Sequence, residues 1–159
     1  TLKKALAPAG QTRVVWIHGM KDSSAESEAR RIKVAAPIHC LIGCGLPDRL
    51  TTNSETVTRL AGRLNVGGLR TVVAADQRSK FRGYSVRNMN QWFRINGYPF
   101  SRVETMQLEL SWSGVREEGY IDRTAKILSS ALKTLMESGN SFRFALCGLL
   151  SLKPSLFSH

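Results

Sequence analysis

A histidine and a glutamate of this chain stand where catalytic side chains are often found. His18 closes a short β-rich run, residues 13–18, and Gly19 follows it. In open α/β sheets, ligands bind beyond the carboxyl ends of the strands. An imidazole at that edge can ligate a metal ion or act as a general base. A partly buried histidine that is hydrogen-bonded to backbone is the alternative that the sequence leaves open.

Glu109 lies in a second β-rich run, in which polar and apolar residues alternate. Gln107 and Glu109 share one face of a strand, whereas Met106, Leu108 and Leu110 share the other. The carboxylate either faces solvent on an edge strand or stands at the mouth of a pocket, where burial would tune it as a base. Gln107 could hydrogen-bond a substrate amide or orient Glu109.

Arg82 belongs to the most basic part of the chain. Residues 51–100 hold eight basic and two acidic side chains, so they carry +6 of the formal net charge of +11. The guanidinium of Arg82, in a glycine-containing loop, can bind a carboxylate through two hydrogen bonds. The same cluster of cations can also be a solvated surface, or it can attract a polyanion.

Alternating strand and helix patterns must position these residues. The order predicts an α/β fold with a mostly parallel central sheet flanked by helices. We expect a lead-in over residues 1–12, one domain over 13–139 and an apolar tail over 140–159, which is either a last strand or an unrelated extension. The expected strands are 13–18, 38–42, 71–75 and 105–110, and the expected helices are 54–66 and 117–137.

Composition limits the class of protein. The 159 residues are 42% apolar and 22% charged, which suits one packed domain rather than a disordered chain. The sequence contains no apolar run of membrane-spanning length and no visible signal peptide. Three cysteines leave one unpaired in any disulfide scheme, which favours a reducing compartment. A cytoplasmic location without membrane contact is therefore the expectation.

Four segments in order resemble the N-formylglutamate amidohydrolase family. The run VVWIHGM (14–20) is similar to a strand that supplies a zinc-ligand histidine, and LIGCGLPDR (41–49) to the next strand with its glycine-rich turn. KFRGY (80–84) is similar to a Pro-Phe-x-Gly-Gly loop, and TMQLEL (105–110) to a Gln-x-Glu strand. The resemblance implies a zinc carboxypeptidase-like (phosphorylase/hydrolase-like) architecture.

The resemblance also implies a chemistry. His18 would ligate zinc, and Glu109 would be the general base that takes a proton from water. Arg82 would pair with a carboxylate of a glutamate-like substrate, and Gln107 would steady the site. The implied reaction is zinc-dependent hydrolysis of a linear amide C–N bond in a small acidic substrate.

The chain departs from the family at three points, one of which is Ala74 and Ala75 where the family usually has an asparagine near the Pro-Phe loop. Trp16 stands where the family has an aspartate two residues before the zinc histidine. The remaining zinc ligands of the family come from a segment upstream of the matching part, whereas a catalytic zinc normally has three protein ligands. The expectation is therefore a fragment that is truncated at the N-terminus and is inactive by itself, or a zinc-free pseudoenzyme.

An alternative hypothesis, a non-enzymatic function, depends on the basic stretch alone. The chain would then be a basic domain that binds RNA or another polyanion through its cationic residues. Nucleic acid is the less favoured partner because the sequence contains none of the usual nucleic-acid-binding motifs.

Overall fold

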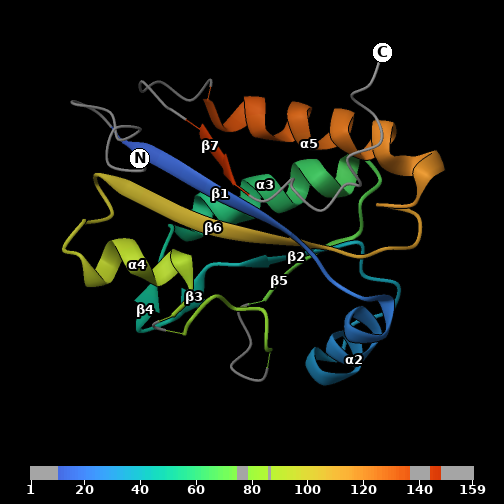
Figure 1. Cartoon of the computed structure of the whole chain (residues 1–159), viewed down its shortest axis with the longest axis horizontal. Helices are drawn as coiled ribbons and strands as arrows, with labels where there is room; N and C mark the ends of the chain where they lie inside the picture. The colour runs from blue at the N-terminus through green and yellow to red at the C-terminus, as the bar shows by residue number, and fades with distance from the viewer. Residues whose placement is uncertain (1–10, 75–78, 86, 137–143, 148–159) are drawn as a thin grey trace, which may run out of the picture.

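A mixed β-sheet forms the centre of the molecule (Figure 1). The computed structural model describes residues 11–74, 79–85, 87–136 and 144–147. The sheet has five strands in the order β5-β2-β6-β1-β7, and a separate two-stranded hairpin is formed by β3 and β4. The strands are β1 (Thr12–Gly19), β2 (Cys40–Gly43), β3 (Gly45–Leu46), β4 (Arg49–Leu50), β5 (Thr71–Val73), β6 (Val103–Leu110) and β7 (Phe144–Cys147).

The strand directions confirm the expected α/β class. β1 runs parallel to both β6 and β7, and β2 runs parallel to β5, whereas β2 and β6 are antiparallel. The helical segments are α2 (Asp22–Ile32), α3 (Ser54–Val66), α4 (Met89–Ile95), the 3₁₀ turn η1 (Glu118–Tyr120) and α5 (Ile121–Met136). No helix in the described ranges has both the length and the apolar character needed to cross a membrane.

Helices cover the two faces of the sheet differently. On one face, α3 and α5 lie together and bury the largest apolar cluster, which includes Val15, Met106 and Leu108 (Figure 1). On the other face, α2 packs near Leu41, and α4 packs near Trp16 through Phe93. The residues of β1 and β6 that alternate with the large cluster therefore face the side of α2 and α4.

Most expected elements are present, with shifted ends. The expected helix 54–66 is α3, whose start is capped by the Asn53 side chain, and the expected helix 117–137 is η1 followed by α5. The helices α2 and α4 are not among the expected elements. Within the apolar tail, β7 pairs with β1 as an edge strand. Residues 1–10 and the rest of the tail lie outside the described residues.

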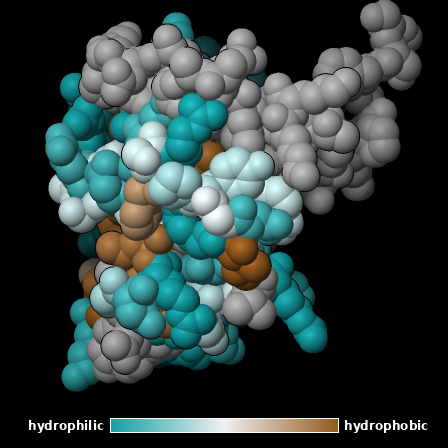
Figure 2. All heavy atoms as spheres, turned by 90° about the vertical axis from the view of Figure 1, so that its left-hand side faces the viewer, coloured by the Kyte–Doolittle hydropathy of each residue, from teal (hydrophilic) through white to brown (hydrophobic). Residues whose placement is uncertain are grey.

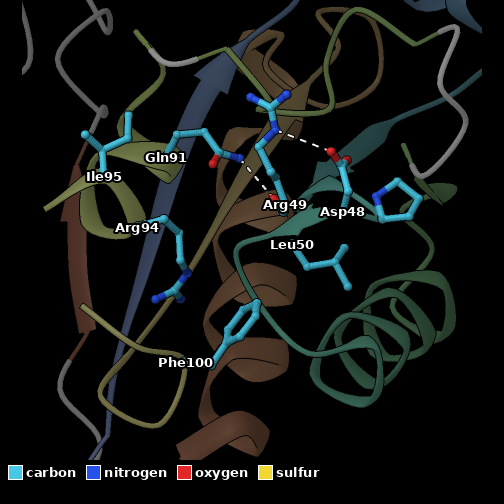
Figure 3. A pocket seen from close by; sticks show the side chains of 8 residues that line it. Asp48, Arg49, Leu50, Gln91, Arg94, Ile95 and Phe100 are labelled. Carbon is cyan, nitrogen blue, oxygen red and sulfur yellow. Dashed lines mark hydrogen bonds and ion pairs between the residues drawn. The ribbon is translucent and has the colours of Figure 1, made fainter. Parts of the chain in front are cut away.

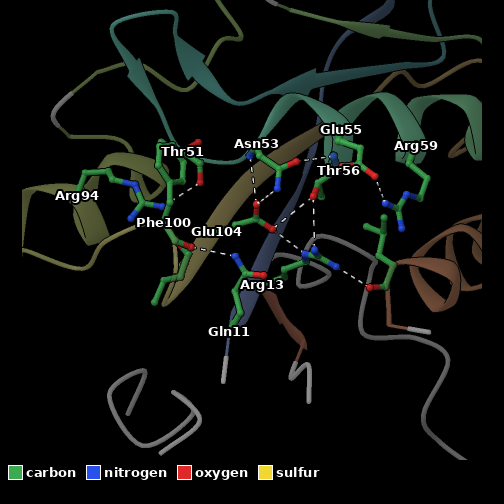
Figure 4. A network of polar contacts seen from close by, with 12 residues as sticks. Gln11, Arg13, Thr51, Asn53, Glu55, Thr56, Arg59, Arg94, Phe100 and Glu104 are labelled. Carbon is green, nitrogen blue, oxygen red and sulfur yellow. Dashed lines mark hydrogen bonds and ion pairs between the residues drawn. The ribbon is translucent and has the colours of Figure 1, made fainter. Parts of the chain in front are cut away.

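A buried ionic network joins the amino ends of β1 and β6 to two helices (Figure 4). Arg13 Nε donates to Glu104 Oε2 at 2.7 Å, and Arg13 Nη1 donates to the Leu135 carbonyl at 2.6 Å. The backbone N–H and the side-chain amide of Asn53 donate to Glu104 Oε1 at 3.2 and 2.7 Å. Because Arg13 and Glu104 are only 7% and 1% exposed, the charges are compensated inside the protein.

Candidate active site

His18 and Glu109 lie side by side at the carboxyl ends of two neighbouring strands. The parallel register of β1 and β6 pairs His18 directly with Glu109, and Trp16 with Gln107. Paired residues project from the same face of a sheet, here the face that α2 and α4 cover. His18 is exposed, whereas Glu109 is 8% exposed. The sheet therefore places an accessible imidazole next to a buried carboxylate.

The environment of Glu109 favours its protonated form. Burial raises the pKa of Glu109 from 4.5 to about 7, and the positive charge of Arg116 acts in the opposite direction. A carboxyl group with a pKa near neutrality populates both protonation states at physiological pH. It can therefore accept a proton and return it, as general acid–base catalysis requires.

Gln107 is held in place by hydrogen bonds on both ends of its amide. Its Nε2 donates to Glu109 Oε1 at 3.2 Å and to the Phe81 carbonyl at 3.0 Å, and its Oε1 accepts from Asn88 Nδ2 at 2.8 Å. Asn88 also caps α4, because its Oδ1 accepts from the Asn90 backbone N–H at 2.8 Å. The amide of Gln107 therefore points toward Glu109, as an orienting residue would.

Arg82 lies in a loop that packs tightly over β2 and β6. A Cβ on Gly43 would come within 2.2 Å of the Phe81 carbonyl oxygen, so the loop backbone rests on the glycine. Arg82 is 8% exposed, and its guanidinium carbon lies 4.4 Å from the centre of the Tyr84 ring. The loop thus brings Arg82 to the same region of the sheet as Gln107, and contact of Arg82 with a substrate carboxylate stays a prediction.

Three further residues at this edge make contacts that were not expected from the sequence. Asn88 holds Gln107, and Arg116 contributes charge near Glu109. Asp22 begins α2, accepts from the Trp112 N–H at 2.8 Å and from the Ser113 hydroxyl at 2.7 Å, and its pKa is lowered chiefly by that hydroxyl. These contacts join segments that lie far apart in the chain, so no local spacing could have indicated them.

The described residues do not fit a complete zinc site. Within the described ranges, no three His, Cys, Asp or Glu side chains are grouped so that they could hold a metal ion. His18 and Glu109 form only a pair, and Asp22 is engaged by Trp112 and Ser113. A catalytic zinc normally has three protein ligands. The implied zinc therefore lacks a full donor set among these residues.

Two of the three cysteines, Cys40 and Cys44, are not suited to nucleophilic chemistry. Cys40 and Cys44 are both free and buried. Burial raises the pKa of the Cys40 thiol to about 12, and it also raises the pKa of Cys44. Because the thiolate is the reactive form, both residues behave as small apolar core residues.

A surface pocket of about 470 Å³ lies between the β3–β4 hairpin and α4, apart from the four expected site residues (Figure 3). The guanidinium of Arg94 donates to the backbone carbonyls of Thr51, Tyr98 and Val103 and lies 4.2 Å from the centre of the Phe100 ring. Figure 2 shows scattered apolar patches separated by hydrophilic side chains on this side of the molecule. The pocket is lined by Pro47, Asp48, Arg49, Leu50, Gln91, Arg94, Ile95 and Phe100.

The arrangement of strands and helices defines an α/β domain with a mixed central sheet. The fold is similar to the crystal structure of N-formylglutamate amidohydrolase from Ralstonia eutropha JMP134, with a TM-score of 0.50 and 17% sequence identity. The match covers 79% of this chain and 44% of that chain, so this chain spans less than half the length of the solved enzyme. No protein-family model and no curated protein matches the sequence. The similarity confirms the fold that the four segments imply.

Proposed function

We propose that this chain is part of a hydrolase similar to N-formylglutamate amidohydrolases and supplies its general base. This hydrolase would cleave the amide bond of a small acidic substrate. The observation that carries the proposal is the placement of Glu109. It is a buried carboxyl group with a pKa of about 7 at the carboxyl edge of the sheet. The neighbouring His18 and the fold similarity to the Ralstonia enzyme support the same reading.

Glu109 would move one proton through the reaction. Its carboxylate removes a proton from a water molecule, and the oxygen of that water attacks the carbonyl carbon of the amide. The C–N bond then breaks, and the proton held by Glu109 passes to the leaving nitrogen. The products are a carboxylic acid and an amine, and Glu109 is again ionised. Gln107 keeps the carboxyl group in one orientation through its bond to Oε1.

The other expected participants have roles that follow from charge. His18 is the side chain that would bind zinc, a metal that polarises carbonyl groups, but the described residues hold no complete ligand set for it. Arg82 would attract a substrate carboxylate, and the net charge of +11 would raise the local concentration of an acidic substrate. An acidic amide is thus the substrate class that suits the chain.

Hydrolysis of N-formyl-L-glutamate by the purified chain tests this proposal, with glutamate release measured with and without added zinc. We expect slow release by the wild-type chain, because the described residues supply only part of a zinc ligand set, and a further loss of about 10²- to 10⁴-fold in Glu109→Gln, the usual contribution of a general base. Glu55→Gln is the matched control, because Glu55 is exposed on α3 and its ion-pair partner among the described residues is Arg59. N-formyl-L-glutamine, which lacks the side-chain carboxylate, should react more slowly. Equal rates for wild type and Glu109→Gln would overturn the proposal.

A further inference from the structure

The guanidinium of Arg116 connects the carboxyl ends of β1 and β6 through hydrogen bonds. Its Nε donates to the Leu110 carbonyl at 3.1 Å and to the Ser111 carbonyl at 3.0 Å, and its Nη2 donates to the Met20 carbonyl at 3.0 Å. Leu110 is the last residue of β6, and Met20 directly follows β1. The Met20 N–H also donates to the Leu110 carbonyl at 2.7 Å. One side chain therefore bonds to both strand ends.

Gly19 provides the space in which this guanidinium lies. A Cβ at Gly19 would come within 2.4 Å of Arg116 Nη1 and 2.5 Å of Arg116 Cζ. Gly19 pairs with Leu110 in the sheet and follows His18 directly. On its other side, Arg116 Cζ lies 5.2 Å from the centre of the Trp112 ring. The glycine and the arginine thus form one packed unit beside the His18–Glu109 pair.

We propose that Arg116 is a positioning residue for the His18–Glu109 pair, an inference that rests on the proposed function. Both residues stand one position before the end of their strands, where a sheet frays most easily. By bonding three backbone carbonyls beyond the pair, Arg116 fixes the spacing between the imidazole and the carboxyl group. The same placement brings a positive charge to the edge that holds Glu109.

The groups around Glu109 define what its titration reports. His18 is beside it on β1, Gln107 on its own strand is neutral, and Arg116 acts from the segment after β6. Cys40 on β2 senses the charge of Glu109, but its thiol does not ionise near neutrality. Arg82 belongs to the loop over β2 and β6. Substitution of Arg116 therefore tests its own contribution to the pKa of Glu109 and leaves the other side chains in place.

Titration of Glu109 by ¹³C NMR without substrate tests the proposal. The labelled Glu109 signal is identified by its loss in Glu109→Gln and is followed in the wild type, Arg116→Gln, Arg116→Lys and Gly19→Ala. Gly19→Ala displaces the guanidinium and keeps its charge, and Arg116→Lys keeps the charge but cannot reproduce the fork of hydrogen bonds. We expect the titration midpoint to move upward in all three variants. Gly62→Ala is the control, because a Cβ there meets nothing within 4 Å.

Two results would overturn the proposal. An unchanged midpoint in all three variants would mean that Arg116 only stabilises the fold. An upward shift confined to Arg116→Gln would mean that its charge acts regardless of where the side chain lies. The titration does not require hydrolysis, so it can be measured even if the proposed reaction does not occur. Equally, hydrolysis can be observed even if the titration midpoint does not move.

Discussion

Neutralising Glu104 should remove a large part of the stability of the fold. In Glu104→Gln, the new NH2 group would oppose a donor in either orientation, because Arg13 Nε now donates to Glu104 Oε2 at 2.7 Å and Asn53 donates to Oε1. Arg13 is 7% exposed, so its charge would lose a carboxylate where water cannot replace it. Removing one partner of a buried ion pair costs about 3–5 kcal/mol. Because small domains are stable by only about 5–15 kcal/mol, this loss would be easy to measure.

Urea denaturation of the wild type and three variants provides the assay for this prediction. The control Glu55→Gln removes an i,i+4 pair on the surface of α3, whose glutamate side chain is 80% exposed, and should cost about 0.5 kcal/mol or less. The double variant Arg13→Met/Glu104→Gln should be more stable than Glu104→Gln, because it no longer holds a buried charge without its carboxylate. The m value, which is the slope of the free energy of unfolding against urea concentration, should stay unchanged. A loss in Glu104→Gln no larger than that in Glu55→Gln would refute the reasoning.

Two further predictions concern the site and the loop above it. Burial raises the pKa of Glu109 from 4.5 to about 7, so between these pH values the folded state holds a proton that the unfolded chain has released. The free energy of unfolding should therefore fall as the pH rises from 4.5 to 7 and level off above 7. Urea midpoints across this range should show the fall in the wild type and a flatter profile in Glu109→Gln. Gly83→Ala should destabilise more than Gly97→Ala, because both glycines have positive φ (71° and 79°) but only at Gly83 would a Cβ meet Asn90 Nδ2 at 2.4 Å. Equal thermal midpoints of these two alanine variants would contradict the tight loop packing.

Long periodic elements were predictable from the sequence, and weakly patterned ones were not. The helices α3 and α5 have clear apolar stripes, and α3 begins at a capping asparagine. The missed helix α2 buries only Ala25, Glu28 and Ala29, and its N-cap residue, Lys21, makes no capping hydrogen bond with its side chain. The missed helix α4 has only seven residues. Tertiary packing rather than local pattern stabilises such helices.

For the candidate site, the strand positions of its residues were predictable, whereas their side-chain contacts were not. Strand ends and alternation indicated His18, Gln107 and Glu109, and the parallel register then placed His18 beside Glu109. The carbonyl contacts of Arg116 and the bond from Asn88 to Gln107 depend on how distant segments meet. The antiparallel pairing of β2 with β6 was also not predictable, because the residue pattern of a strand does not indicate the direction of its neighbour.

The pairing of β1 with β6 also has a consequence for the folding rate. Its two partners are 91 residues apart in the chain, as the Arg13–Glu104 bond shows, and α2, β2, β3, β4, α3, β5 and α4 lie between them. Closing so long a loop costs chain entropy before any of the pair's contacts form, which slows folding. We therefore expect the His18–Glu109 pair to form late, after the intervening β2, α3 and β5 have begun to pack. On the ribosome, it cannot form until β6 has left the exit tunnel.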